Sequence, residues 1–168
     1  MVVTKKVCDF CDNIENRART VYRLGPTWSF LSNTPITPGH TLICPVRCVA
    51  TMAELDALEV IDIFCKHLAV VQGLLVEVFD AEGFDHGWNQ NEVAGQTVPH
   101  LHLHVVPRVT GDIERLGYDP RQFLYRPGFR KPSPQSELEE VAQKLRRAFL
   151  IWILRPPSSE SERRSFFI

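Results

Sequence analysis

The sequence lacks an excess of charge of either sign, because 19 Lys and Arg side chains stand against 20 Asp and Glu side chains, for a formal net charge of −1. Proteins that are held by nucleic acid polymers or anionic membranes through their overall field carry a clear surplus of positive charge. The longest apolar run, residues 148–154, is also far below the roughly 20 residues that a membrane-spanning helix needs. We therefore expect neither a nucleic acid polymer nor a membrane as a partner.

The start of the chain, Met-Val-Val-Thr-Lys-Lys, lacks the apolar stretch of a secretory signal. We expect a cytoplasmic protein, in which the five cysteines do not form a disulfide framework. Cys44 and Cys65 stand among apolar residues and are expected to be small buried side chains. Cys8 and Cys11 instead form a Cys-x-x-Cys pair, which is the spacing of half a zinc site.

The 168 residues provide enough chain for one ordinary domain, and their β-prone stretches are short. The runs Thr-Val-Tyr-Arg-Leu and Thr-Trp-Ser-Phe-Leu flank Gly25-Pro26 and predict a hairpin within residues 20–32. Three further strands are predicted at residues 40–45, 84–89 and 101–107. Together these strands predict an antiparallel five-stranded meander sheet.

Two helical patterns are expected to pack on this sheet. Thr51-Met-Ala-Glu54 has the form of a capping box, and apolar residues recur behind it at three- and four-residue steps through residues 55–78. This pattern predicts one long helix. A second helix is predicted over residues 136–152, after a long irregular loop over residues 110–134. The predicted fold class is therefore α+β.

The composition divides the chain into three parts. Residues 1–112 are expected to form the core of the domain, and residues 113–155 a loop and helix packed on it. Residues 156–168 follow a Pro-Pro pair and are rich in Ser, Glu and Arg, so we expect a disordered tail.

Three histidines alternate with leucines in His100-Leu-His102-Leu-His104. Side chains on a strand repeat every second residue, so the three imidazoles are expected to share one face. Neighbouring histidines on that face would lie about 6.6 Å apart and the outer two about 13 Å apart. The outer pair is therefore poorly placed to ligate one metal ion together, and three histidines with three separate roles fit the spacing better.

A turn that can hold an anion lies just upstream, in Ala94-Gly-Gln-Thr-Val-Pro99. Its backbone N–H groups and the Thr97 hydroxyl can face an anion beside the imidazoles. Neutral imidazole is nucleophilic, and neighbouring imidazoles can act as acid or base near neutral pH. This combination suits phosphoryl or nucleotidyl transfer.

Two other interpretations stay open on these residues alone. A histidine in a strand is often only a partly buried structural side chain. Two histidines at i and i+2 could instead bind zinc in a metal hydrolase, although no carboxylate lies close in the sequence. His67 is expected to be structural because it lies in the middle of the long helix, and His86 is not assigned.

The segment from Gly95 to Arg108, Gly-Gln-Thr-Val-Pro-His-Leu-His-Leu-His-Val-Val-Pro-Arg, resembles the signature of the histidine-triad (HIT) superfamily of nucleotide hydrolases and transferases. Pro38-Gly39-His40 resembles the second motif of that family, and the likeness runs from about residue 8 to residue 112. The resemblance implies an antiparallel sheet that dimerises into a continuous ten-stranded sheet. It also implies a two-step hydrolysis, in which His102 attacks the α-phosphate and water hydrolyses the resulting nucleotidyl-histidine.

The resemblance also implies roles for other residues. His104 would help the leaving group and His40 would orient the nucleophile. The phosphate would be held by Asn89, Gln96 and Thr97. The nucleoside pocket would be lined by Phe10, Phe30, Leu31 and Leu42. Ser32 and Asn33 stand where many members have an Asp that binds the ribose, and they offer hydrogen bonds without its charge.

Other motifs resemble two different branches of the family. Pro107-Arg108-x-x-Gly111-Asp112 resembles the fragile-histidine-triad branch, which cleaves dinucleoside polyphosphates, and His104 replaces the Gln that is typical of transferases. Cys8-x-x-Cys11 resembles the zinc-bearing microbial members. Those members complete their site with a histidine after the third strand and with the first histidine of the triad.

Cys48 takes the position of the histidine after the third strand here, eight residues after His40, and cysteine is an equally good zinc ligand. The resemblance therefore implies a structural Zn²⁺ bound by four residues, with unmetallated thiols as the alternative. These residues are Cys8, Cys11, Cys48 and His100. A divalent cation such as Mg²⁺ is expected to accompany the substrate.

Together these features predict a homodimeric hydrolase of dinucleoside polyphosphates or related adenylyl esters and amidates. The alternative is a nucleotide-binding sensor or interaction protein with slow residual hydrolysis.

Overall fold

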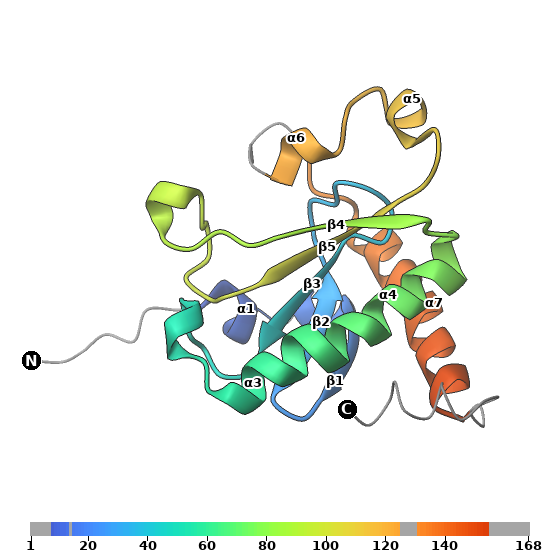
Figure 1. The fold of residues 1–168 in the computed structure, drawn as a ribbon. Coiled ribbons are helices and arrows are strands. Elements are labelled where there is room, and N and C mark those ends of the chain that lie inside the picture. The colour runs from blue at the N-terminus through green and yellow to red at the C-terminus, as the bar shows by residue number, and fades with distance from the viewer. Residues whose placement is uncertain (1–7, 14, 125–130, 155–168) are drawn as a thin grey trace, which may run out of the picture.

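A five-stranded antiparallel sheet forms the centre of the computed structural model, which describes residues 8–13, 15–124 and 131–154 (Figure 1). The order of the strands in the sheet is β1-β2-β3-β5-β4. Their bounds are Thr20–Leu24 for β1, Thr27–Leu31 for β2, Thr41–Pro45 for β3, Gly83–Gly87 for β4 and Leu103–Arg108 for β5. The predicted α+β class, the five strands and their antiparallel pairing are confirmed.

The meander continues only as far as β3, because β5 pairs with β3 and β4 lies at the edge of the sheet. The burial of the two strands accounts for this order. Most residues of β5 are buried, whereas no residue of β4 is fully buried. An apolar strand gains more from a central position, and a half-exposed strand tolerates the edge.

The long helix is one continuous rod in three parts: α3 (Ala57–Ile61), a π-helical stretch (Asp62–His67) and α4 (Leu68–Phe79). The predicted capping box at Thr51 forms, but it caps only a short 3₁₀ turn, Met52–Glu54. The helix itself begins after a second capping box, in which the Glu59 N–H donates to the Asp56 carboxylate at 2.8 Å. The predicted start of the helix at residue 55 is therefore wrong, because Leu55 is extended.

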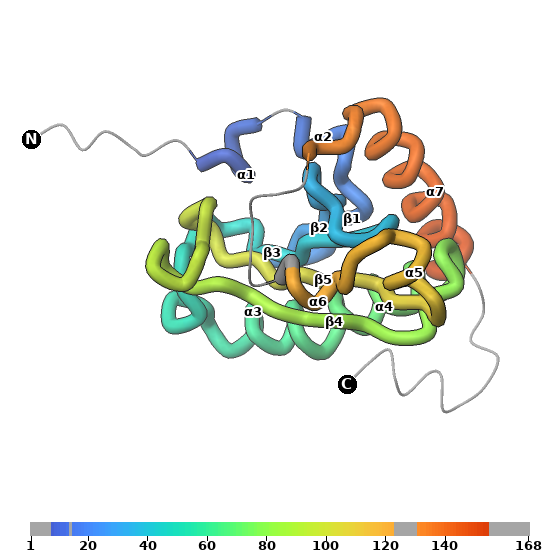
Figure 2. The backbone as a smooth tube through the Cα atoms, turned by 90° about the horizontal axis from the view of Figure 1, so that it is seen from above, coloured from blue at the N-terminus to red at the C-terminus, as the bar shows by residue number. Residues whose placement is uncertain are grey.

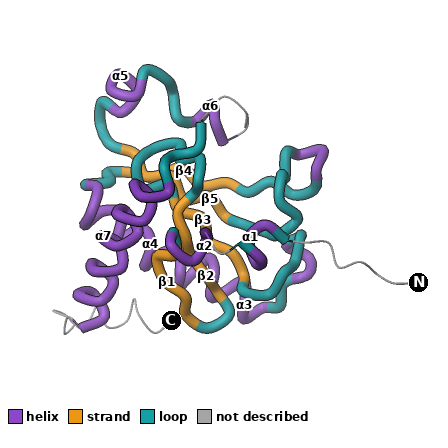
Figure 3. The backbone as a smooth tube through the Cα atoms, turned by 180° about the vertical axis from the view of Figure 1, so that it is seen from behind, coloured by secondary structure: helices purple, strands orange, loops and turns teal. Residues whose placement is uncertain are grey.

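The second helix, α7 (Gln135–Leu154), packs against β1 and beside α4 (Figure 2). Together these helices cover one face of the sheet and enclose the main core. The strands contribute Val21, Tyr22, Leu31, Ile43, Leu103 and Val105, and the helices contribute Val71, Leu74, Leu75, Leu138, Ala142 and Leu145. Figures 2 and 3 show α1 (Asp9–Asp12) and α2 (Glu15–Ala18) on the side of the sheet away from α4.

The segment predicted as an irregular loop, residues 110–134, contains two short helices, α5 (Asp112–Leu116) and α6 (Arg121–Leu124). Gly111 and Gly117 bound α5 with positive φ values of 76° and 74°, which glycine adopts without strain. The predicted tail at residues 156–168 lies outside the described residues. None of the described helices is both long and apolar enough to cross a membrane.

Candidate active site and metal site

His100 and His102 precede β5, and His104 lies within it. The Leu101 N–H donates to the Val49 carbonyl at 2.6 Å, so the chain leaves the sheet pairing at this point. The expectation of one regular strand through all three histidines is therefore wrong. The rings of His102 and His104 lie 5.0 Å apart, whereas the His100 ring is aimed at two cysteines.

His40 joins the triad from the loop before β3, where Leu42 pairs with His104 across the sheet. The Ile36 N–H donates to His40 Nδ1 at 3.1 Å, so the imidazole proton of neutral His40 is on Nε2. That Nε2–H donates to Nδ1 of His104 at 2.9 Å. The proton of neutral His104 is therefore on its own Nε2.

His102 has the opposite tautomer. Its Nδ1–H donates to the backbone carbonyl of His100 at 2.8 Å, which leaves the lone pair of Nε2 available. The side chain is almost fully buried, and burial lowers the pKa of His102 below the ordinary value for histidine. The ring is therefore neutral at pH 7, which is the form that acts as a nucleophile.

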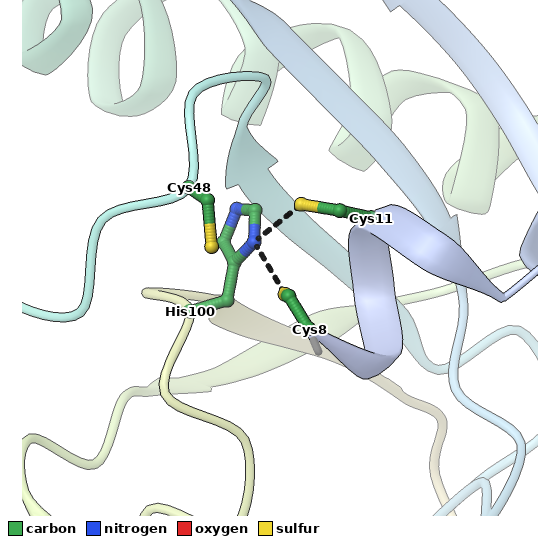
Figure 4. Close-up of side chains that lie close together, drawn as sticks. All are labelled: Cys8, Cys11, Cys48 and His100. Atoms are coloured by element: carbon green, nitrogen blue, oxygen red, sulfur yellow. Dashed lines mark hydrogen bonds between the residues drawn. The ribbon is translucent and has the colours of Figure 1, made fainter. Parts of the chain in front are cut away.

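The residues predicted to bind zinc come together at one point in space (Figure 4). Cys8 and Cys11 come from the first turn of described chain, Cys48 follows β3 and His100 precedes β5. Their Sγ and nitrogen atoms all lie within 4.8 Å of one another. Donor atoms around a tetrahedral zinc are separated by roughly 3.5–3.8 Å, so a small contraction would close the site around the ion.

His100 is oriented as a ligand should be. Its Nε2–H donates to the Pro45 carbonyl at 2.8 Å, so the lone pair of Nδ1 faces the Sγ atoms of Cys8 and Cys11 at 3.4 and 3.5 Å. A metal-binding imidazole usually donates its other N–H in this way. Partial burial and the neighbouring thiols raise the pKa of Cys11 to about 12, so a metal ion must displace protons to bind.

Phe10, Phe30 and Leu42 lie beside the triad on the face of the sheet opposite the main core. The Phe10 ring packs edge-on against Phe30 and against His102, with centroids 5.1 Å apart in each case. Trp28 also contacts Phe30, at 4.4 Å, and was not expected from the sequence. Trp28 stands two residues before Phe30 on the same strand, so the sequence could have placed its side chain on the same face.

Leu31 does not join this group. Neighbouring side chains on a strand point to opposite faces, so Leu31 packs in the core under α7 while Phe30 faces the triad. The assignment of Leu31 to the nucleoside pocket stays a prediction. Ser32 is buried next to it and accepts a hydrogen bond from the Thr34 N–H at 3.3 Å, and Asn33 is exposed.

The residues expected to hold phosphate lie in the loop between β4 and β5. The side chain of Gln96 is buried and bridges two loops, donating to the Ala50 carbonyl at 2.9 Å and accepting from the Asn91 N–H at 2.7 Å. Thr97 is exposed and lines a depression of about 530 Å³ together with Gln96. The amide of Asn89 lies against Gly95, whose φ is +90°.

Arg108 of β5 connects β4 and α5 through ion pairs. Its guanidinium binds Asp85 of β4 and Asp112 of α5, with the closest contact to each at 2.5 Å. This contact lowers the pKa of Asp112. Sequence reasoning identified Arg108 and Asp112 by motif but missed Asp85, because pairing between β4 and β5 brings it into reach.

The chain is similar in sequence to known proteins. A family model described as the HIT domain matches residues 13–111. The chain is 36% identical over 95 residues to the asymmetrical bis(5'-nucleosyl)-tetraphosphatase of Schizosaccharomyces pombe, a match covering 56% of this chain and 52% of that protein. It is 28% identical over 125 residues to the bis(5'-adenosyl)-triphosphatase of Dictyostelium discoideum, covering 73% and 80%. The matches thus span between about half and four fifths of these relatives.

The fold is also shared with a solved structure. A Zn-bound histidine triad family protein from Mycobacterium smegmatis superimposes with a TM-score of 0.60 at 25% identity. The superposition covers 88% of this chain and 96% of that one.

Proposed function

The chain belongs to the HIT family, and on that premise we propose that it hydrolyses dinucleoside polyphosphates or related adenylyl esters and amidates. The observation that carries the proposal is the pair of opposite tautomers at His102 and His104. A lone pair for attack and an N–H for the departing group lie on adjacent rings. The names of the two relatives from Schizosaccharomyces pombe and Dictyostelium discoideum support this substrate class.

The proposed reaction has two steps. Nε2 of His102 attacks the α-phosphorus, forming an N–P bond while the P–O bond to the leaving phosphate breaks, and the His104 Nε2–H hydrogen-bonds the departing oxygen. Water then attacks the same phosphorus. The N–P bond breaks, its electron pair returns to His102, and a nucleoside monophosphate and a proton are released.

The nucleoside is proposed to bind beside the triad, against the apolar group of Phe10, Phe30 and Leu42. Aromatic side chains favour stacking with a base, and Ser32 or Asn33 would hydrogen-bond the ribose. Asn89, Gln96 and Thr97 are proposed to position the phosphates. A divalent cation such as Mg²⁺ is proposed to accompany the polyphosphate, because burial lowers the pKa of His102 and so disfavours a positive charge there that could balance the phosphates.

We also propose that Cys8, Cys11, Cys48 and His100 hold a structural zinc ion. The supporting observation is the orientation of the His100 lone pair toward the thiols. Four protein ligands leave no open position for a catalytic water, so the ion would serve to fix the chain.

A homodimer is proposed to form through the edge strand β4, which would extend the sheet to ten strands. Leu58, Ile61 and Cys65 recur at helical spacing on the exposed side of the long helix, and Leu58 is 74% exposed. The helix runs along β4, since Gln72 and His86 lie within hydrogen-bond distance at 3.3 Å. An open strand edge beside an apolar stripe fits a second copy of the chain.

The proposed activity is tested by a substrate panel. Purified protein is assayed with diadenosine triphosphate, diadenosine tetraphosphate, adenosine phosphoramidate and adenylyl sulfate, and the products are separated by chromatography. We expect AMP as a product from at least one of them. Binding of AMP without hydrolysis of any member would support the nucleotide-binding sensor instead.

A further inference from the structure

The Cys-x-x-Cys turn carries an aromatic side chain toward the triad. Phe10 lies between the two cysteines, and its ring reaches His102, Phe30 and His100, with centroid distances of 5.1, 5.1 and 5.7 Å. Cys8 and Cys11 are therefore the two residues that flank a wall of the proposed nucleoside pocket. A change in the position of this turn must move that wall.

The turn has little support of its own. Helix α1 has four residues, which is too short to be stable without outside contacts. Apart from the contacts of Cys8 and Cys11 with His100, its described polar contacts to the rest of the chain come from Asn16, which donates to the carbonyls of Asp9 and Phe10 at 2.8 and 3.0 Å. Neutral thiols attract one another weakly, so a bound metal would contribute most of the force that holds the turn against His100.

His100 connects the same site to the nucleophile by a second route. Its imidazole faces the thiols through Nδ1, and its backbone carbonyl accepts the Nδ1–H of His102 at 2.8 Å. That hydrogen bond sets the tautomer of His102. Fixing the His100 ring therefore also fixes the acceptor that keeps the attacking nitrogen deprotonated.

We propose that occupancy of the Cys₃His site controls nucleoside binding and the nucleophile, with Phe10 and the His100 carbonyl as the two connecting groups. This inference rests on the proposed function, because it takes the proposed nucleoside pocket and zinc site as its two ends. Phe10 is a positioning residue here as well as a wall of the pocket. Zinc and nucleoside monophosphate then favour each other's binding by the same factor, as linkage requires.

A purely structural role of the metal predicts a different result. If zinc only stabilised the fold, protein that stays folded after zinc removal would bind AMP as before. Coupling instead requires a fold-change in AMP affinity between two folded forms. Circular dichroism at the temperature of the binding experiment establishes that both forms are folded.

The experiment measures AMP binding by calorimetry to zinc-loaded protein and to protein stripped with a chelator. We expect AMP to bind zinc-loaded protein at least about fivefold more tightly, which is the lower end of typical coupling between sites. Saturating AMP should tighten zinc binding by the same factor in a competition titration. Equal AMP affinity of the two folded forms would overturn the inference and leave the proposed hydrolase intact.

Variants distinguish the role of Phe10 from the role of the metal ligands. Phe10→Ala should keep zinc and lose most of the zinc dependence of AMP binding, and Phe10→Leu provides a milder second variant. Cys48→Ala should weaken zinc binding and AMP binding together, and Cys48→His should restore both because imidazole is also a zinc ligand. Cys65→Ser changes an exposed cysteine outside the cluster, on the proposed dimer surface, and should leave zinc binding and its coupling to AMP binding unchanged.

Two further results would contradict parts of the account. Absence of AMP binding to zinc-loaded protein, together with no turnover of the substrate panel, would contradict the proposed function itself. Full zinc dependence in Phe10→Ala would overturn the role of Phe10. In the long-range ¹H–¹⁵N spectrum, the His102 tautomer should be single in zinc-loaded protein and mixed after zinc removal.

Discussion

The tautomer of a buried histidine follows from the hydrogen bonds that its two ring nitrogens make. His100 donates from Nε2 to Pro45, His102 donates from Nδ1 to His100, and His40 donates from Nε2 to His104. His67 differs, because its Nε2 has no hydrogen-bond partner among the described residues although the side chain is only 2% exposed. Its ring stacks on Tyr22 at 4.0 Å, as a structural side chain in the middle of the helix.

This burial makes His67 a source of acid sensitivity. Burial lowers the pKa of His67 to about 3, whereas an unfolded histidine has a pKa of about 6.5. The unfolded chain therefore binds the extra proton first as pH falls, and the stabilisation present above pH 6.5 is lost between about pH 6.5 and pH 3. Between pH 7 and pH 4.5 the loss from this group should be on the order of 2 kcal/mol.

His67→Phe keeps an aromatic ring on Tyr22 but removes the titrating group. We expect the free energy of unfolding of this variant, from urea denaturation, to fall less between pH 7 and pH 4.5 than that of the unmodified protein. Since the comparison is a difference between two pH values, any repacking cost common to both cancels. Parallel pH dependence of the two proteins would show that His67 is not responsible.

At the scale of elements, local pattern predicted most of the fold and long-range pairing did not follow from it. The alternating and 3.6-residue periods predicted all five strands and both long helices. They could not place β5 between β3 and β4, because strand pairing across distant segments leaves no local period. Spacing predicted Cys8 and Cys11 as half of the metal cluster, whereas Cys48 and His100 were predicted by resemblance, since their distance along the chain from that pair carries no geometric information.

Other errors have identifiable physical causes. Cys65, predicted to be buried, is exposed, because the neighbouring Phe64 is the side chain that packs against the main core, whereas Cys44 in β3 is buried as predicted. The start of the helix was misplaced because two capping boxes occur within residues 51–59, and only the one at Asp56 precedes the continuous helix.

The corrected start of the helix is testable with a matched pair of variants. Asp56→Ala removes the side chain that accepts the Glu59 N–H, so we expect a loss of about 1 kcal/mol in the free energy of unfolding. Thr51→Ala removes the cap of a 3₁₀ turn only, and its effect should be clearly smaller. A larger loss for Thr51→Ala in urea denaturation would restore the original prediction of the helix start.

At the scale of the whole molecule, two of the exposed apolar surfaces in the described part of the chain lie on different helices. One is the stripe of Leu58, Ile61 and Cys65 on the long helix, whose later part contacts the edge strand β4 through Gln72 and His86. The other is the end of α7, where Leu150 and Leu154 are 58% and 79% exposed. The α7 helix packs against β1, at the opposite edge of the sheet from β4. A single twofold interface through β4 therefore uses the first surface and leaves the second outside it.

A charged substitution on each surface tests which of the two surfaces forms the dimer interface. Leu58→Glu should convert the proposed dimer to a monomer in light scattering at micromolar concentration, because it buries a carboxylate in the interface. Leu150→Glu should remain a dimer. Both side chains are exposed, so neither change should unfold the chain. A monomeric Leu150→Glu with a dimeric Leu58→Glu would transfer the interface to α7, and a monomeric unmodified protein would contradict the dimer.

The most direct measurement of the central claim is the covalent intermediate on His102. Protein mixed with diadenosine tetraphosphate is quenched under alkaline conditions within milliseconds and digested, and the peptides are analysed by mass spectrometry. We predict an adenylyl group on the peptide that contains His102, absent from His102→Ala, whose turnover should fall by at least about 10³-fold while AMP still binds. Turnover of His102→Ala within tenfold of the unmodified protein, with no adenylylated peptide in either, would contradict the account.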